Sequence, residues 1–212
     1  MKKNQTLTLC GEIYSEPMHI CGFFASEDER YEVILPYLKE GLENNEEVLN
    51  ILESTSYTNH CERLSQSGIS VNEKLANSQL KVLSADETYL KEGSFAADKM
   101  YNLVEKALVG TKDSGYNSIR ACGDMTWALR NVSGTDELIE YEARLNYLTP
   151  KHSCSLICMY DINRFSGRAL ADILTTHPYV ILNKRIHKNP HYIEPFEYLP
   201  TLLRHPKRPL SN

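Results

Sequence analysis

The sequence lacks several features that would place it in a specialised class of protein. No apolar run approaches the ~20 residues of a membrane-spanning helix, and the N-terminus has neither the apolar segment nor the cleavage site of a signal peptide. The six cysteines show no paired C-x-x-C spacing, and several lie in apolar runs, where reduced and buried thiols are usual. A net charge of −5 argues against a general nucleic-acid surface. We therefore expect a cytoplasmic domain with no membrane association and no direct binding of nucleic acid.

Short apolar segments alternate with amphipathic ones along the chain. Continuous apolar runs, rather than in/out alternation, are typical of parallel strands that are covered on both faces. The expected strands are residues 19–24, 47–52, 80–83, 118–124, 154–160 and 179–182, the last antiparallel or at an edge. The expected helices are residues 27–42, 59–66, 94–109, 136–148 and 166–176. The pattern predicts an α/β fold with a mostly parallel central sheet and helices on both faces.

The length of 212 residues suits one domain of this kind with short additions at its ends. We expect an N-terminal extension over residues 1–17, the folded domain over 18–192, and a proline-rich tail over 193–212. Four prolines in that tail predict an absence of regular structure, and Arg204, Lys207 and Arg208 make it mildly basic. A solvated tail is favoured over an arm that binds a partner.

The turn after the first strand lacks a phosphate-binding loop. Such a loop needs several glycines, a lysine that reaches the outer phosphates, and a serine or threonine for magnesium. Here Gly22 is followed by no Gly-Lys-Ser/Thr, and residues 27–29 are all acidic. Ser26 and Glu29 instead have the spacing of a capping box at the start of the next helix. ATP hydrolysis at this turn is therefore not expected.

Acidic residues follow two strands of the predicted sheet. Asp124 precedes Trp127 and Arg130, and Asp161 follows Tyr160. Ligands of open α/β sheets bind beyond the carboxyl ends of the strands, so these side chains could line a pocket. In the alternative interpretation both acids cap turns, the tryptophan lies in the core, and the arginine pairs with an acid. No G-x-S-x-G motif or hydrolytic triad is evident, and we predict no enzymatic activity.

His19 and Cys21 point to one face of the first strand, because side chains alternate with a period of two. Imidazole and thiolate groups are ligands of soft metals, and Cys122 and Cys158 could complete such a site. These residues could equally contact a small organic ligand, or be core thiols beside a hydrogen-bonded histidine. The core interpretation is favoured, so we predict no metal site, and the sequence identifies no cofactor.

Several segments of the chain together carry a resemblance to one known family. They are HICGFFASEDER (19–30), YLKEGLE (37–43), GDMTWAL (123–129), YEARLN (141–146), ICMYD (157–161) and THP (176–178). These segments resemble the MEDS domain, which is the DcmR-like sensory domain of methanogens and methylotrophs. The resemblance extends from about Met18 to Pro195, and the family in turn resembles a degenerate relative of the KaiC/RecA-type ATPase core.

The resemblance implies a sensory, signal-transducing role, with simple hydrocarbon or one-carbon derivatives as ligands. The H-x-C motif of the family falls on His19 and Cys21, and its G-D-M-x-W motif on residues 123–127. The residues expected to bind the ligand are His19, Cys21, Ser26, Asp124, Trp127, Arg130, Tyr160 and Asp161.

The output of the domain is also implied by the resemblance. Too few residues follow Pro195 for an output domain, so the signal is expected to pass to a separate regulator, such as a kinase, an anti-sigma factor or a transcription factor. A homo-oligomer is compatible with this interpretation. The alternatives are a KaiC-like regulatory protein that binds nucleotide without hydrolysing it, and a structural partner with an empty pocket.

Overall fold

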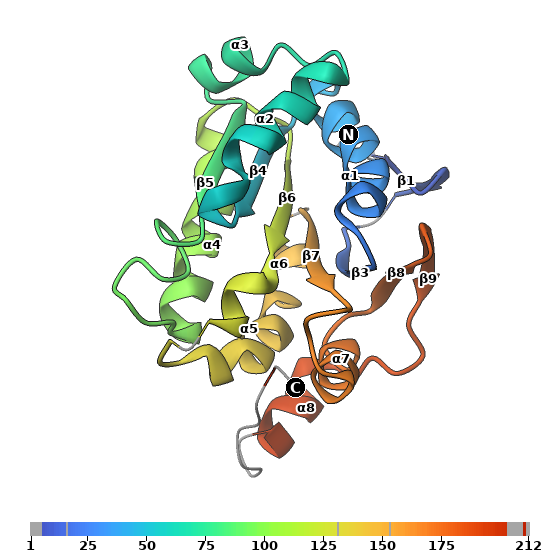
Figure 1. Cartoon of the computed structure of the whole chain (residues 1–212), viewed down its shortest axis with the longest axis vertical. Coiled ribbons are helices and arrows are strands. Elements are labelled where there is room, and N and C mark those ends of the chain that lie inside the picture. Colours follow the sequence, from blue (N-terminus) through green and yellow to red (C-terminus); the bar gives the residue numbers. More distant parts are fainter. Residues whose placement is uncertain (1–5, 16, 131, 153, 203–209, 211–212) are drawn as a thin grey trace.

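A computed structural model describes residues 6–15, 17–130, 132–152, 154–202 and 210, and its centre is a seven-stranded sheet (Figure 1). The strand order is β5-β4-β6-β7-β3-β8-β9, and all neighbours pair in parallel except β8 and β9. The strands are β3 (His19–Phe24), β4 (Glu47–Leu52), β5 (Leu80–Ser84), β6 (Ile119–Asp124), β7 (Ser155–Asp161), β8 (Tyr179–Leu182) and β9 (Arg185–Lys188). The predicted α/β fold with a mostly parallel sheet is confirmed.

Helices cover both faces of the sheet, so its strands are buried on both sides (Figure 1). One face packs against α1 (Glu27–Glu43), α2 (Tyr57–Gln66), α3 (Val71–Ala76) and the small hairpin of β1 (Leu7–Leu9) and β2 (Glu12–Tyr14). The other face packs against α4 (Ala97–Asp113), α5 (Leu138–Leu145), α6 (Leu148–His152) and α7 (Gly167–Leu174). The short 3-10 turns are η1 (Ser54–Ser56), η2 (Met125–Leu129) and η3 (Thr135–Glu137).

Helix α1 begins where its capping residues predict. The backbone N–H of Glu29 donates to the Ser26 hydroxyl at 3.2 Å, and the Glu29 carboxylate accepts from the backbone N–H of Ala25 at 2.8 Å. Pro36 lies inside the helix but neither ends it nor delays its start. The helix therefore runs without interruption from the first turn after β3 to Glu43.

Two expectations about the C-terminal region are wrong. The segment 179–182 forms β8, which lies inside the sheet beside β3 and parallel to it, and β9 takes the edge position. Part of the segment from residue 193 is regular, because α8 (Pro195–Leu202) forms and packs beside α5 (Figure 1). Proline is compatible with the first helical position, where the missing N–H would have no intrahelical partner. The basic residues of the expected tail lie outside the described residues.

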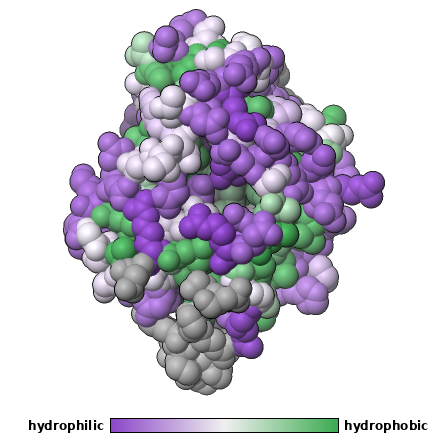
Figure 2. Space-filling view, in the orientation of Figure 1, coloured by the Kyte–Doolittle hydropathy of each residue, from purple (hydrophilic) through white to green (hydrophobic). Residues whose placement is uncertain are grey.

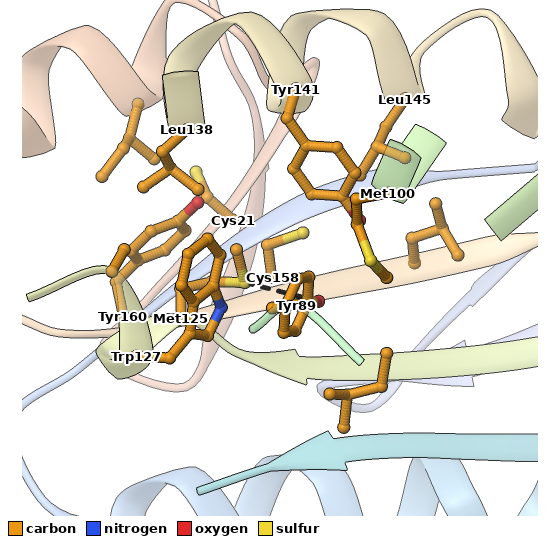
Figure 3. Packing of buried hydrophobic residues seen from close by; sticks show 14 of the residues in the cluster. Cys21, Tyr89, Met100, Met125, Trp127, Leu138, Tyr141, Leu145, Cys158 and Tyr160 are labelled. Carbon is orange, nitrogen blue, oxygen red and sulfur yellow. Dashed lines mark hydrogen bonds between the residues drawn. The ribbon is translucent and has the colours of Figure 1, made fainter. Parts of the chain in front are cut away.

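The core against α4 and α5 is rich in aromatic and sulfur-containing side chains (Figure 3). Trp127 is fully buried and stacks on Tyr89, with ring centroids 4.6 Å apart and an interplanar angle of 15°. Phe95 contacts the same indole ring at 4.6 Å. Trp127 thus occupies the centre of a packed aromatic group.

The opposite face of the sheet contains a buried arginine. Arg120 on β6 is 2% exposed and pairs with Glu46, and its Nη1 donates to Glu40 Oε2 at 2.6 Å and to the carbonyl of Tyr37 at 2.9 Å. A Cβ atom on Gly41 would lie 2.9 Å from Cδ of this arginine. A glycine at this position of α1 therefore leaves room for the guanidinium group.

Polar and apolar side chains are unevenly distributed over the face that Figure 2 shows. Hydrophilic side chains cover most of the upper half of the face in Figure 2, and apolar ones gather in its lower half, where α5 and α7 lie. Among the described residues, no helix combines the length and the apolar character needed to span a membrane.

Candidate functional site

A cavity of about 220 Å³ opens at the carboxyl ends of β3, β6 and β7. We call it the strand-end cavity. Its lining residues are Phe24, Ser26, Glu27, Arg30, Glu53, Thr55, Ser56, Asp124, Thr126, Met159, Tyr160, Asp161 and Arg164. The cavity lies where open α/β sheets bind their ligands.

Asp124 is the most constrained acid of the strand-end cavity. Its Oδ1 accepts hydrogen bonds from the backbone N–H and the hydroxyl of Thr126, at 3.0 and 2.6 Å. Its Oδ2 accepts from Nη1 of Arg30 on α1 at 2.8 Å. The carboxylate therefore caps the turn η2 and at the same time ties α1 to the end of β6.

Four of the eight residues expected to bind a ligand line this cavity: Ser26, Asp124, Tyr160 and Asp161. Asp161 also caps the turn that follows it, since its Oδ1 accepts from the backbone N–H of Asn163 at 2.9 Å. Arg130 pairs instead with Glu53 and with Asp86, the latter at 2.6 Å. Asp124 and Asp161, which were expected to bind a ligand, thus also cap the turns that follow them.

The other three expected residues lie inside the protein. Trp127 belongs to the aromatic core, and the Cys21 thiol donates to the carbonyl of Tyr179 at 3.7 Å. His19 lies on the same face of β3 as Cys21, as their spacing predicts. Cys122 packs on the opposite face of the sheet, so it is not placed to share a metal ion with them.

A second group of polar side chains surrounds His19 and is completely buried. Nε2 of His19 lies 3.2 Å from Oε2 of Glu142 and 3.5 Å from Sγ of Cys158. The same carboxylate oxygen lies 3.3 Å from Nε2 of His177. The Cys158 thiol is 3.2 Å from this oxygen. We call these four side chains the buried His-Glu-Cys cluster.

The buried His-Glu-Cys cluster is assembled from distant parts of the chain. His19 begins β3, Cys158 is in the middle of β7, Glu142 is on α5, and His177 lies between α7 and β8. The Tyr160 hydroxyl donates to Oε1 of Glu142 at 2.7 Å. Tyr160 is also among the residues that line the strand-end cavity, so the two polar regions are adjacent at this residue.

Residues 18–178 match the sequence model of MEDS, the methanogen/methylotroph DcmR sensory domain. The chain belongs to the MEDS family. It is 27% identical over 161 residues to the transcriptional repressor DcmR of Methylorubrum extorquens, which covers 75% of this chain. The match spans 57% of the repressor, so the MEDS chain corresponds to little more than half of that relative.

A solved structure supports the fold of the MEDS domain. The crystal structure of a KaiC-like protein from the hyperthermophilic archaeon Pyrococcus horikoshii OT3 has a TM-score of 0.56 to this chain. The sequence identity is 11%, and the match covers 79% of this chain and 72% of the other. The predicted similarity of fold to KaiC-like proteins is confirmed.

The charge state of the buried His-Glu-Cys cluster of this MEDS domain follows from its environment. Burial, and then the proximity of His177, lower the pKa of His19 to about 4, so this imidazole is neutral at pH 7. Burial alone would raise the pKa of Glu142, but contacts with His177 and His19 outweigh it and hold the pKa well below its usual value. Burial raises the pKa of the Cys158 thiol, which is therefore protonated.

Two members of the cluster were not among the residues expected to bind a ligand. Glu142 and His177 lie in the segments YEARLN and THP, which carry the family resemblance. Neither residue lies at the carboxyl end of a strand, where ligand-binding residues were expected. A glutamate on the buried stripe of an amphipathic helix is a usable signal, because carboxylates are rarely buried without a partner. Its partners, however, could not be read from the sequence.

His60 on α2 is a further buried histidine, on the other side of the sheet. Its Nδ1 lies 3.0 Å from the Tyr31 hydroxyl, and its Nε2 has no hydrogen-bond partner among the described residues. Burial, and then the charge of Arg30, lower the pKa of His60 to about 4. The unfolded chain has a histidine pKa of about 6.5, so between these values it binds a proton that the folded protein does not.

We therefore expect the free energy of unfolding to fall as the pH falls from 6.5 towards 4, partly through His60. The variant His60→Gln should reduce this dependence by about one proton, or about 1.4 kcal/mol per pH unit near pH 5. Urea denaturation at several pH values measures the slope. His187→Gln, at an exposed position on β9, is the control. An unchanged slope in His60→Gln would contradict the assignment.

Proposed function

We propose that this MEDS domain senses a small molecule in the strand-end cavity and reports its binding to a separate regulatory protein. The observation that carries the proposal is the cavity itself, which joins apolar walls to charged groups at the carboxyl ends of three parallel strands. Such concave sites with a few convergent polar groups are typical of ligand binding. The proposed role is binding, without catalysis.

The size and lining of the cavity favour a ligand of few atoms. Its volume of about 220 Å³ is below the ~300–1,000 Å³ of pockets that hold drug-sized ligands. Phe24 and Met159 supply apolar contact, while Arg30, Asp124 and Arg164 supply charge. We propose a simple hydrocarbon or one-carbon derivative that carries a polar group.

The same lining disfavours a nucleotide, which is the ligand of the alternative hypothesis. Glu27, Glu53, Asp124 and Asp161 all face the cavity, and their negative charges repel a polyphosphate. Of the two arginines in the lining, Arg30 and Arg164, the first is already paired with Asp124 and Glu27. Calorimetry with ATP and magnesium is therefore expected to give no heat of binding.

A ligand in the cavity could act through the ion pair between Arg30 and Asp124. A polar ligand that bonds either partner competes with this pair and so changes the attachment of α1 to β6. The equilibrium between the two arrangements can shift only by the difference in the ligand's affinity for them. We propose that the altered surface at α1 is what a kinase, an anti-sigma factor or a transcription factor reads, in a monomer or a homo-oligomer.

The proposal is tested by filling the cavity. Thr55 lines it and is exposed, so Thr55→Trp places an indole in the opening, while Thr58→Trp places one at an exposed site outside the lining. Thermal unfolding is measured with methanol, methylamine and a halogenated methane. A ligand at 100 times its dissociation constant should stabilise the wild type by about 2.7 kcal/mol. Thr55→Trp should weaken binding at least tenfold, and Thr58→Trp should leave it unchanged.

Two outcomes would overturn the proposal. In one, none of the three compounds stabilises the wild-type protein. In the other, a compound binds Thr55→Trp as tightly as Thr58→Trp, which would place its site elsewhere. A heat of binding with ATP and magnesium that Thr55→Trp abolishes would favour the nucleotide hypothesis instead.

A further inference from the structure

The hydrogen-bond network around the buried His-Glu-Cys cluster assigns the hydrogens of both imidazoles. The Asn146 amide nitrogen donates to the carbonyls of Thr176 and Ala143, at 2.7 and 3.0 Å, so Asn146 Oδ1 is an acceptor. It lies 3.1 Å from Nδ1 of His19, which must therefore carry the hydrogen. Nδ1 of His177 faces the carbonyl of Ile173 at 2.9 Å and must carry a hydrogen for the same reason. In each ring the second nitrogen, Nε2, then points into the cluster.

Both Nε2 atoms converge on one carboxylate oxygen. They face Oε2 of Glu142, and Nε2 of His177 makes no hydrogen bond with any residue that the structure describes. All four residues are buried, so water is not at hand to separate the atoms. A nitrogen lone pair that faces a carboxylate oxygen is repelled unless a cation lies between them, and either a proton on the imidazole or a metal ion meets this requirement. The arrangement is therefore suited to a positive charge at its centre.

Four of the six distances between the ligand atoms are close to those around a tetrahedral metal ion. With Zn–N and Zn–O of about 2.0–2.1 Å and Zn–S of about 2.3 Å, a tetrahedron has N–O edges of about 3.3 Å and edges to sulfur of about 3.5 Å. The corresponding distances here are 3.2 and 3.3 Å from the two Nε2 atoms to oxygen, 3.5 Å from His19 to sulfur, and 3.2 Å from oxygen to sulfur. One ligand atom from each of the four residues lies within 4.8 Å of all the others.

The charge and the supporting contacts fit the same ion. One carboxylate and one thiolate balance a divalent cation, so the occupied site would be neutral in a fully buried place. Both histidines are oriented through Nδ1, by Asn146 and by Ile173, and Glu142 is oriented by the Tyr160 hydroxyl. Such outer contacts are usual around metal ligands.

We propose that His19, Glu142, Cys158 and His177 bind a tetrahedral divalent metal ion of the zinc type. The two Nε2 atoms, Oε2 of the carboxylate and Sγ are the ligand atoms. In the occupied site the Cys158 thiol has lost its proton to solvent, both imidazoles bind as neutral rings through Nε2, and Glu142 binds as the carboxylate. The site does not depend on the proposed small ligand, although it is adjacent to the strand-end cavity at Tyr160.

Cobalt is the probe for this site. The full-length protein, reduced and freed of metal by a chelator, is titrated with Co²⁺. We expect the strong visible absorption of tetrahedral Co²⁺ and a near-ultraviolet thiolate charge-transfer band, both saturating at one equivalent and both removed by Zn²⁺. Thermal unfolding of the same sample should shift to higher temperature when Zn²⁺ is added.

Two buried cysteines on neighbouring strands provide a matched comparison. Cys158→Ala should abolish the charge-transfer band and weaken zinc binding at least 100-fold, because it removes the sulfur ligand. Cys122→Ala removes a similarly buried thiol from the opposite face of the sheet. It should keep both the charge-transfer band and the affinity for zinc. His19→Gln and His60→Gln form a second pair. We expect His19→Gln to weaken zinc binding and His60→Gln to leave it unchanged.

The proposal fails if the wild-type protein shows no charge-transfer band with Co²⁺, or if Cys158→Ala and Cys122→Ala give the same spectrum. Should Cys158→Ala not fold, Cys158→Ser, which keeps the size of the side chain, replaces it. Thr55→Trp distinguishes this site from the cavity, since it should keep the full cobalt spectrum even where it loses the small ligand.

Discussion

Replacing Arg120 by methionine should lower the free energy of unfolding by about 3–5 kcal/mol, because it leaves a buried charge without its main partner. Arg120 and Glu46 are 2% and 1% exposed, and the guanidinium also bonds Glu40 and the carbonyl of Tyr37. Methionine fills much of the space but satisfies none of these acceptors. Urea denaturation followed by far-ultraviolet circular dichroism measures the loss.

A partly exposed arginine serves as the control for Arg120. Arg144 pairs with Asp98 at 2.6 Å and with Glu140 at 3.3 Å, but the Asp98 side chain is 80% exposed. Exposed pairs contribute about 0–1 kcal/mol, so Arg144→Met should cost no more than that. The double variant Arg120→Met/Glu46→Gln should recover part of the loss, since the buried carboxylate is removed as well. Equal costs for Arg120→Met and Arg144→Met would refute the prediction.

Replacing Trp127 by alanine should also lower the free energy of unfolding by about 3–5 kcal/mol, the usual cost of deleting a large buried aromatic side chain. The ring is fully buried and stacks on Tyr89 (Figure 3), and it also packs against Phe95. Its Nε1 has no hydrogen-bond partner in the part of the chain that the structure describes. Trp127→Phe should therefore cost much less, because it keeps an aromatic ring and removes an unsatisfied donor. Chemical denaturation of both variants gives the comparison.

This experiment also separates the two interpretations of Trp127 that the sequence allowed. If the residue is a wall of the ligand site, Trp127→Ala should impair ligand binding while leaving the stability nearly unchanged. If it is a core residue, as its stacking indicates, the stability should fall and Trp127→Phe should bind ligand like the wild type. A stable Trp127→Ala protein would contradict the packing argument.

The sheet was predictable from the sequence because parallel strands have a strong local signal. Runs such as the one over 154–160 are apolar at every position, and the helices between them have capping residues and regular apolar spacing. The edge of the sheet was not predictable in the same way. β9 has one buried residue in four, Ile186, and its antiparallel pairing with β8 depends on a tight turn. Helix α8 was missed because proline was taken to exclude a helix, whereas Tyr198 and Leu202 pack against the core and hold it.

The residues of the candidate site were likewise only partly predictable from the sequence. Ser26, Asp124, Tyr160 and Asp161 could be expected to meet because each lies at or just beyond the end of a parallel strand, and the carboxyl ends of such strands share one edge. The buried His-Glu-Cys cluster was predictable only in part. Cys158 was a candidate partner of His19 on a neighbouring strand, whereas Glu142 and His177 reach His19 through the packing of α5 and of the connection between α7 and β8. The expected domain boundaries and the ligand-binding roles stay predictions.

The attachments of α1 determine how that helix could move. Arg30 on its first turn is bonded to Asp124, and Glu40 near its last turn is bonded to Arg120, so both ends are fixed to β6. The two attachments differ in strength, because the second belongs to a buried network and the first lies at the wall of a cavity. If a ligand breaks the ion pair between Arg30 and Asp124, the C-terminal end of α1 stays attached and acts as a pivot, and the N-terminal end moves. Over a helix of 17 residues, about 25 Å long, a small tilt at the pivot becomes a displacement of several ångströms at the other end.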